Sequence, residues 1–315
     1  MDKAGPVVCL GIMVADLVAR PVTSFPRPLT LVEEMSLHTG GCAVNAAVAL
    51  AKLGIPAEVI GKVGLDALGD FLVGELARNG VGTEGVVRDA RRGTSATMVL
   101  VNPEGERGFL HFLGANASFS PAEVDLARIR RAAILHVAGA LVLPELDGPP
   151  LARILADAKS AGVVTFLDTV WDASDRWMEL IGPLLPSTDY FVPSIAEARR
   201  LTGGESPSEI ARALLDRGAG TVALKMAEEG CFVADARRGE FHVPALKVEV
   251  VDSTGAGDAF AAGFIAGVWD GWPLVTAARF ANAMGALCVT AMGASTGLRT
   301  LAETVAFMEG RTAGI

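Results

Sequence analysis

The second half of the chain alternates between short apolar runs and amphipathic segments with helical spacing. The apolar runs have the length of buried strands and lie at 134–137, 163–167, 190–192 and 221–224. The amphipathic segments lie at 150–161, 177–185, 194–201 and 208–216. Strands that alternate with helices of this length predict a parallel sheet with helices on both faces, and ligands of such sheets bind beyond the carboxyl ends of the strands.

The first half is less regular. Residues 6–14 have the composition of a buried strand, 58–63 form a second, and helices are expected up to Leu53 and over 70–79, each closed by a glycine. The proline-containing segment 20–37 suggests an irregular or short-stranded excursion from the main sheet. Residues 94–101 and 107–113 alternate around Asn102-Pro103-Glu104-Gly105, which predicts a β-hairpin.

One stretch combines a strand pattern, a turn almost without side chains and a helix start. Residues 248–251 form a β-branched run, Gly255-Ala256-Gly257 is the turn, and Asp258 lies in the first turn of an Ala-rich helix. Backbone N–H groups and the helix dipole make such a turn an anion site. An anion site with a carboxylate beside it suits phosphoryl transfer to a hydroxyl, because the amides hold negative charge while the carboxylate accepts the alcohol proton.

Other interpretations of this turn are weaker. A dinucleotide fingerprint requires a third glycine where Phe260 stands, and a Walker loop requires Ser or Thr after Gly-Lys, whereas Gly61-Lys62 is followed by Val63. An ordinary capped helix, with Asp258 only complementing the dipole, remains open on the turn alone.

Composition narrows the class of protein. The 315 residues are 51% hydrophobic and 20% charged, with a net charge of −9, so a large core is expected and a basic nucleic-acid or membrane surface is not. The apolar start is too short to span a membrane and lacks a signal-peptide pattern, which predicts a cytoplasmic protein. The cysteines have no metal-type spacing and are expected as buried thiols: Cys9, Cys42, Cys231 and Cys288.

The segment from Asp252 to Phe264, Asp-Ser-Thr-Gly-Ala-Gly-Asp-Ala-Phe-Ala-Ala-Gly-Phe, resembles the C-terminal signature of the ribokinase family, also called the phosphofructokinase-B carbohydrate kinases. Gly40-Gly41 followed by Asn45 is similar to the N-terminal signature of that family, and the resemblance runs from about Val7 to about Gly297. It implies one ribokinase-like α/β domain over 1–315: a mostly parallel sheet flanked by helices, with a small β-sheet lid from about 15–39 and 94–115.

The resemblance also implies roles for individual residues. Asp258 would be the general base, and the backbone amides of Gly255, Ala256 and Gly257 would form the anion hole. The substrate would be bound by five residues in the N-terminal half: Asp16, Gly40, Gly41, Asn45 and Asn116.

The resemblance implies that a second set of residues binds the nucleotide and its magnesium: Asp168, Ser194, Glu197, Lys225, Ala227, Gly230 and Asn282. Ser194 replaces a family Asn, and Ser194–Glu197 is equally well explained as a capping box. Lys225 and Ala227 replace Thr and Gly of the nucleotide loop, and Lys225 could reach phosphates or point to solvent. Asp168 follows a strand and could bind magnesium water near the phosphates or simply cap a turn.

The resemblance implies a monovalent cation such as K⁺ beside the anion hole, at five positions: Asp252, Thr254, Cys288, Ala291 and Gly293. Oxygen ligands suit such a hard cation. The sequence therefore predicts ATP- and Mg²⁺-dependent phosphorylation of a hydroxyl on a small sugar-like substrate, by a protein that forms a homodimer through its lid.

Two alternatives stay open at this point. A nucleoside kinase on the same fold would need a slot for a base, which Phe109, Phe112 or Trp171 could supply. A non-catalytic sugar-binding regulator would also keep the fold, although the complete anion-hole turn argues against it. Val14 argues mildly against ribose, because ribose-specific members tend to carry a polar side chain there.

Overall fold

The large sheet forms the centre of the molecule. The computed structural model describes residues 5–20, 22, 31–102 and 107–312, and within them nine strands pair in the order β13-β12-β11-β10-β9-β8-β1-β4-β5. Seven of them are parallel: β11 (Thr221–Lys225), β10 (Tyr190–Phe191), β9 (Val164–Thr169), β8 (Ile134–Ala140), β1 (Val7–Gly11), β4 (Ala57–Gly64) and β5 (Gly82–Asp89). An antiparallel hairpin, β12 (Cys231–Asp235) and β13 (Gly239–Val243), completes one edge.

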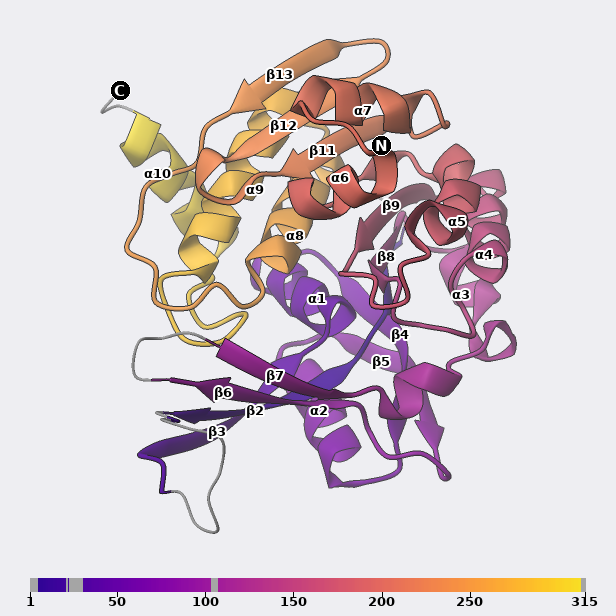
Figure 1. The fold of residues 1–315 in the computed structure, drawn as a ribbon, viewed down its shortest axis with the longest axis vertical. Coiled ribbons are helices and arrows are strands. Elements are labelled where there is room, and N and C mark those ends of the chain that lie inside the picture. Colours follow the sequence, from indigo (N-terminus) through magenta and orange to yellow (C-terminus); the bar gives the residue numbers. More distant parts are fainter. Residues whose placement is uncertain (1–4, 21, 23–30, 103–106, 313–315) are drawn as a thin grey trace.

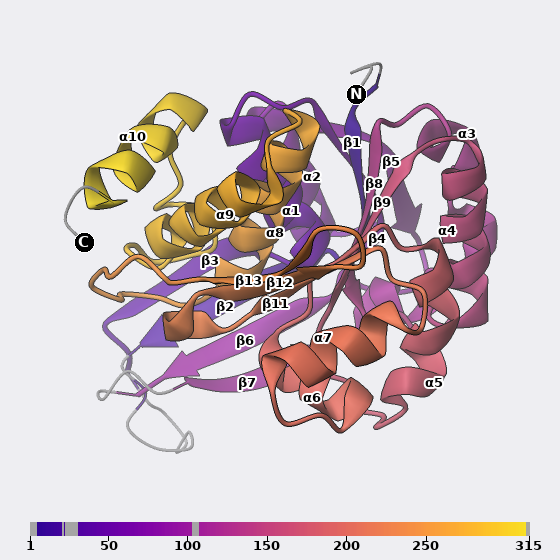
Figure 2. The ribbon, with the colours of Figure 1, turned by 90° about the horizontal axis from the view of Figure 1, so that it is seen from above.

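Helices cover both faces of this sheet (Figure 2). One face carries α1 (Cys42–Lys52), α2 (Ala67–Arg78), α8 (Ala256–Trp269) and α9 (Leu274–Cys288), with α10 (Leu301–Thr312) packed against α9. The other carries α3 (Leu126–Ile129), α4 (Pro149–Ser160), α5 (Trp177–Ile181), α6 (Ile195–Thr202) and α7 (Pro207–Leu215). Strand β1 alternates between the two cores: Val7 and Cys9 face the first, and Val8 and Leu10 face the second. The predicted fold class is confirmed.

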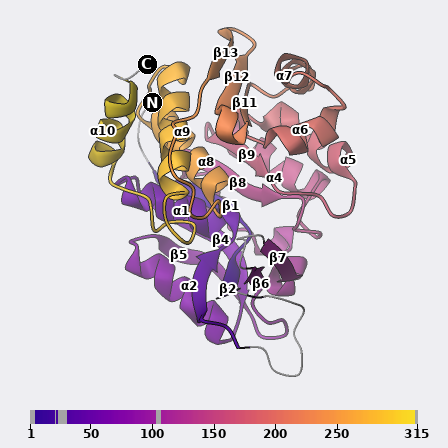
Figure 3. The same ribbon diagram turned by 60° about the vertical axis from the view of Figure 1, so that its left-hand side comes forward.

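A separate four-stranded sheet lies below the α1 and α8 region (Figures 1 and 3). Its strands pair in the order β3 (Glu34–Gly40), β2 (Val14–Arg20), β6 (Ala96–Val101), β7 (Arg107–Phe112). Strands β6 and β7 form the predicted hairpin, from Ala96 opposite Phe112 to Val101 opposite Arg107, and Pro103, Glu104 and Gly105 of its turn lie outside the described residues. Strand β1 passes directly into β2, so one run of chain serves both sheets.

The structure corrects several predicted elements. The predicted strand 248–251 is an irregular segment, with Val250 and Val251 64% and 50% exposed, because β13 already occupies the adjacent edge of the sheet. The predicted strand 6–14 ends as β1 at Gly11, and its last residue, Val14, begins β2 of the other sheet. Residues 20–37, predicted as an irregular or short-stranded excursion, contribute the first part of β3 in the small sheet. The predicted helix 177–185 ends as α-helix at Ile181 and continues as a 3₁₀ helix, η3 (Gly182–Ser187), which contains two prolines.

Candidate active site

The first turn of α8 has the geometry that its sequence predicts. Gly255 is the N-cap in a left-handed conformation, with φ of 76°, and a Cβ there would lie 2.4 Å from the Cβ of Ala294. Only glycine fits this position without strain. The leading N–H groups of a helix have no partner within the helix, although the Ala256 amide donates to the Ser253 carbonyl at 3.3 Å. The amides after Gly255 therefore face the site at the positive end of a 14-residue helix.

Asp258 is held from α1. The Asn45 Nδ2 atom donates to Asp258 Oδ2 at 2.8 Å, and the Cys42 thiol donates to the same carboxylate. Burial raises the pKa of Asp258, while these two donors and the ammonium of Lys225 oppose the rise. The site thus holds a desolvated carboxylate whose charge is supported by directed donors, which is the condition for a general base.

The substrate residues predicted from the N-terminal half lie near this carboxylate. Asn45 is 6% exposed, and its Oδ1 atom accepts no hydrogen bond within the part of the chain that the structure describes. Gly40 packs on Asp16, since a Cβ at Gly40 would lie 2.1 Å from Asp16 Oδ2. Gly41 has φ of 87°, and a Cβ there would meet the Ile12 carbonyl at 2.5 Å.

Burial raises the pKa of Asp16 to about 6; a hydrogen bond from Thr97 opposes the rise, and the charges of Asp258 and Asp252 add to it. Because the charge of Asp258 acts on Asp16, the two carboxylates belong to one site.

Asn116 lies behind the site. It is 1% exposed, its amide donates to the Met13 carbonyl at 3.1 Å, and its carbonyl accepts from the Met13 amide at 3.4 Å. This pair of bonds fixes the junction between β1 and β2. Its predicted substrate contact stays a prediction.

Lys225 and Asp168 form a buried ion pair beside Gly257 of the turn before α8. The Lys225 Nζ atom lies 2.7 Å from both Asp168 oxygens, and a Cβ at Gly257 would lie 3.3 Å from Nζ. The solvent-facing alternative for Lys225 is therefore wrong, because its side chain is only 14% exposed. Burial raises the pKa of Asp168 to about 7 against the pull of Lys225, and Lys225 keeps a raised pKa because its carboxylate neighbours outweigh burial. The pair places a cation beside the turn.

Ser194 and Glu197 form the capping box of α6, with each side chain bonded to the other's backbone amide. Glu197 also accepts from the Thr169 hydroxyl at 3.0 Å, and Ser194 pairs with Lys225 in a parallel bridge. The capping interpretation is thus correct as local structure, and it holds Glu197 close to the ion pair.

The segment predicted as the nucleotide loop, with Ala227 and Gly230, borders a cavity of about 620 Å³. Apolar residues of the segment after β13, of α8 and of α9 line much of it, together with Lys225 and Gly257. Ala227 has φ of 51°, a left-handed conformation where the family pattern has Gly, and a Cβ at Gly230 would meet the Val243 carbonyl at 2.1 Å. Asn282 lines the cavity and donates to the carbonyls of Val243 and Pro244.

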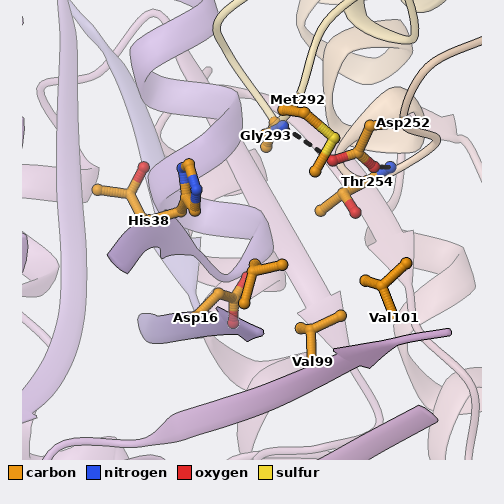
Figure 4. A pocket seen from close by; sticks show the side chains of 11 residues that line it. Asp16, His38, Val99, Val101, Asp252, Thr254, Met292 and Gly293 are labelled. Carbon is orange, nitrogen blue, oxygen red and sulfur yellow. Dashed lines mark hydrogen bonds between the residues drawn. The ribbon is translucent and has the colours of Figure 1, made fainter. Parts of the chain in front are cut away.

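The predicted cation loop is a set of linked turns. Asp252 is 4% exposed and accepts from the amides of Thr254 at 2.7 Å and Gly293 at 2.8 Å (Figure 4). The Cys288 thiol donates to the carbonyls of Thr254 and Ala294 at 3.4 and 3.2 Å. Carboxylate and backbone carbonyl oxygens are ligands that fit a monovalent cation. The ligand roles of Asp252, Thr254, Cys288, Ala291 and Gly293 stay predictions.

The small sheet closes over this loop. Asp16, His38, Val99 and Val101 of the sheet face Asp252, Thr254, Met292 and Gly293 across a cavity of about 20 Å³ (Figure 4). That volume holds about one water molecule.

Two site residues were missed from the sequence. Cys42, which was expected to be a buried thiol, is partly exposed and contacts Asp258, whereas Cys9, Cys231 and Cys288 are buried. His38 lines the small cavity. Spacing carried both signals: Cys42 precedes Asn45 by three residues on one helix face, and His38 precedes Gly40 by two on one face of a strand.

The rings considered as a base slot are on the surface: Phe109, Phe112 and Trp171 are 61%, 58% and 57% exposed. Among the described residues, no group of three or more His, Cys, Asp or Glu side chains is placed to hold a metal by itself. No helix within the described ranges is long and apolar enough to cross a membrane.

The chain is similar to known proteins over most of its length. A family model described as pfkB family carbohydrate kinase matches residues 5–301. The 2-dehydro-3-deoxygluconokinase of Bacillus subtilis is 31% identical over 288 residues, which are 88% of this chain and 88% of that protein. Fructokinase-2 of Zea mays is 32% identical over 280 residues, covering 84% of this chain and 83% of the relative.

Solved structures show the same fold. Arabidopsis thaliana ribokinase in complex with ribose and ATP superposes with a TM-score of 0.86 at 26% identity, covering 97% of this chain and 99% of that one. Fructokinase from Xylella fastidiosa with bound ATP gives a TM-score of 0.83 at 24% identity, covering 98% and 99%.

Proposed function

This chain belongs to the pfkB family of carbohydrate kinases, and we propose that it transfers the γ-phosphoryl group of ATP to a hydroxyl of a small sugar with Asp258 as the general base. The observation that carries the proposal is the pairing of a desolvated carboxylate with the amide turn at the start of α8. Asn45 and Cys42 orient that carboxylate. Such positioning lets it take the proton of an alcohol as the alcohol attacks.

Residues on the two sides of the turn at Gly255–Gly257 would bind the two substrates. Asp16, Gly40, Gly41 and Asn45 face the acceptor, and the 620 Å³ cavity takes the nucleoside part of ATP. The amides of Gly255, Ala256 and Gly257 and the ammonium of Lys225 stabilise negative charge on the transferring phosphoryl group.

Two ions complete the proposal. Asp168 and Glu197 are the carboxylates nearest the phosphate side, and they would hold the water shell of Mg²⁺. When bound, Mg²⁺ neutralises charge on the ATP phosphates. Asp252 and the backbone carbonyls of Thr254, Cys288, Ala291 and Gly293 would hold a monovalent cation that reinforces the anion hole.

The variant Asp258→Asn tests the base. It keeps the shape of the side chain and the capped helix, so we expect a fold unchanged by circular dichroism and a turnover lower by a factor of about 10² to 10⁴. Asp270→Asn, at the far end of the same helix, is the matched control. ADP release would be measured with a panel of sugars, sugar acids, polyols and nucleosides, with Mg²⁺ and with or without K⁺. Full turnover in folded Asp258→Asn would remove the base assignment, and a nucleoside as the best acceptor would replace the sugar.

We also propose that the chain forms a homodimer through the small sheet. Large apolar side chains are exposed on one face of it: by the strand register, Met35, Leu37, Met98, Leu110 and Phe112 share that face, and they are 39–65% exposed. Apolar surface of this kind marks an interface. Sedimentation of the wild type and of Leu110→Asp would test this, with a monomer expected for the variant; a wild-type monomer would contradict it.

A further inference from the structure

A row of polar side chains crosses one face of the small sheet. Four residues at paired positions on neighbouring strands form it: His38 of β3, Asp16 of β2, Thr97 of β6 and His111 of β7. Side chains at paired positions share a face of a sheet, and Asp16 and His38 line the small cavity under it (Figure 4). The row therefore lies on the face turned toward the site, opposite to the apolar face proposed as the dimer interface.

Asp16 is held within this row from two sides. On the β3 side the missing side chain of Gly40 makes room for the carboxylate, since a Cβ there would lie 2.1 Å from Asp16 Oδ2. On the β6 side the Thr97 hydroxyl donates a hydrogen bond to it. A carboxylate packed against backbone on one side and bonded on the other has few orientations left, and such preorganisation lowers the cost of ordering it when a ligand binds.

Thr97 also contacts His111. Its Oγ1 atom lies 3.0 Å from His111 Nδ1. A threonine hydroxyl has one hydrogen to donate, so it can donate to Asp16 or to His111 but not to both. An ionised carboxylate only accepts, and it is the stronger acceptor, so the hydrogen of Thr97 belongs to Asp16 and Thr97 accepts from His111.

This assignment fixes the state of the imidazole. His111 has to carry a hydrogen on Nδ1, because the other tautomer would present a lone pair to an oxygen that has no hydrogen left for it. Burial lowers the pKa of His111, so the ring is neutral at pH 8 and donates as the Nδ1–H tautomer. The bond from His111 polarises the Thr97 hydroxyl and strengthens its bond to Asp16.

We infer that Thr97 and His111 are positioning residues for the acceptor: His111 donates to Thr97, Thr97 donates to Asp16, and this relay fixes the carboxylate that faces the acceptor. The inference rests on the proposed kinase function, in which Asp16 lies on the acceptor side. The alternative is an ordinary cross-strand Thr–His pair, which stabilises the hairpin and does nothing for the acceptor.

The first test observes the imidazole directly and needs no acceptor. Long-range ¹H–¹⁵N spectra of the histidine-labelled protein at pH 8 distinguish the two neutral tautomers. The chain has four histidines, so the signals lost in His111→Asn assign the ring. We expect the Nδ1–H tautomer in the wild type and a smaller share of it in Thr97→Val, which keeps the shape of the side chain without its hydroxyl. The Nε2–H tautomer in the wild type would overturn the relay.

The second test measures turnover of the acceptor with the highest kcat/KM in the panel of sugars, sugar acids, polyols and nucleosides. Thr97→Val is expected to lower this kcat/KM about tenfold, and His111→Leu about threefold to tenfold, while the KM for ATP stays within about twofold of the wild type. Thr97→Ser keeps the hydroxyl and His111→Asn keeps a donor near the position of Nδ1. Each of these conservative variants is expected to stay within about threefold of the wild-type kcat/KM.

Thr221→Val is the matched control. It also removes a threonine hydroxyl that donates to an aspartate on the next strand, Asp235 at 2.7 Å, but it lies outside both cavities. Its kinetic constants for the acceptor and for ATP are expected to equal those of the wild type. Urea unfolding of all variants measures what each substitution costs in stability.

The outcomes separate the inference from the kinase proposal. A wild-type acceptor kcat/KM in Thr97→Val, or equal changes in the constants for the acceptor and for ATP, would overturn the positioning role and leave the kinase proposal intact. No transfer to any acceptor by the wild type would overturn the kinase proposal, and the inference falls with it.

Discussion

Asp16→Asn should make the protein more stable at neutral pH. The folded structure raises the pKa of Asp16 from its ordinary 3.8 to about 6, chiefly by burial. The folded state therefore binds this proton more tightly than the unfolded chain does, so the group favours folding below about pH 4 and loses that effect as the pH rises to 6 and above. Charged Asp16 is thus a cost at neutral pH.

A rise of about two pKa units corresponds to about 3 kcal/mol in the free energy of unfolding. Asparagine removes the charge and keeps the size, so Asp16→Asn is expected to gain at most about 3 kcal/mol at pH 8, less what is lost at the Thr97 bond. For a chain of 315 residues this is a rise in Tm of about 2–5 °C. Near pH 4 the gain should vanish.

Urea and thermal unfolding followed by circular dichroism at pH 4.5, 6 and 8 would measure it. Glu309→Gln, an exposed carboxylate on α10, is the control and should change stability by less than about 0.5 kcal/mol at each pH. A gain that is the same at pH 4.5 and pH 8, or a loss at pH 8, would refute the reasoning. A gain at pH 8 together with lost activity would place Asp16 among residues kept for function at a cost in stability.

Three further outcomes are expected. Gly255→Ala should lower the free energy of unfolding by about 1–3 kcal/mol and remove most activity, because its Cβ would clash with Ala294. Gly271 is also left-handed but has open space around it, so Gly271→Ala should cost only about 1 kcal/mol. Equal losses in urea unfolding would contradict the clash with Ala294. Lys225→Met should lower the free energy of unfolding by about 3–5 kcal/mol, because it leaves Asp168 buried without its cation. The double variant with Asp168→Asn should regain stability but not the wild-type KM for ATP. Full recovery of that KM would be the contrary result. Cys42→Ala removes a donor that lowers the pKa of Asp258, the proposed base, so the acid limb of the pH profile of kcat/KM should move to higher pH. An unmoved limb would show that the thiol has no such role.

The parts of this structure that could be predicted from the sequence are those set by local pattern. The alternation of apolar runs and helices after residue 132 specified the parallel sheet, and the bare turn before Asp258 specified the helix start. The strand predicted at 248–251 was wrong because a β-branched run forms a strand only where a sheet edge is open to it. Pairings between distant segments could not be read locally, and Lys225 with Asp168, 57 residues apart, is the clearest case.

In the candidate site, too, local motifs could be predicted and contacts between distant segments could not. Asp258 and the residues around Gly40 were predicted because each stands in a short motif. The contact of Cys42 with Asp258 depends on how α1 packs against α8, which the chain specifies only through the whole core.

The passage of β1 into β2 has a practical consequence. Four chain connections join the small sheet to the rest of the molecule: β1 to β2 through Ile12 and Met13, β3 to α1 through Gly41, β5 to β6 through residues 90–95, and β7 to the residues after Phe112. Asn116 bonds both backbone groups of Met13 and so fixes the first of these connections. A redesign of what the enzyme accepts can therefore change side chains along the strands of the small sheet while the residues of these four connections are kept.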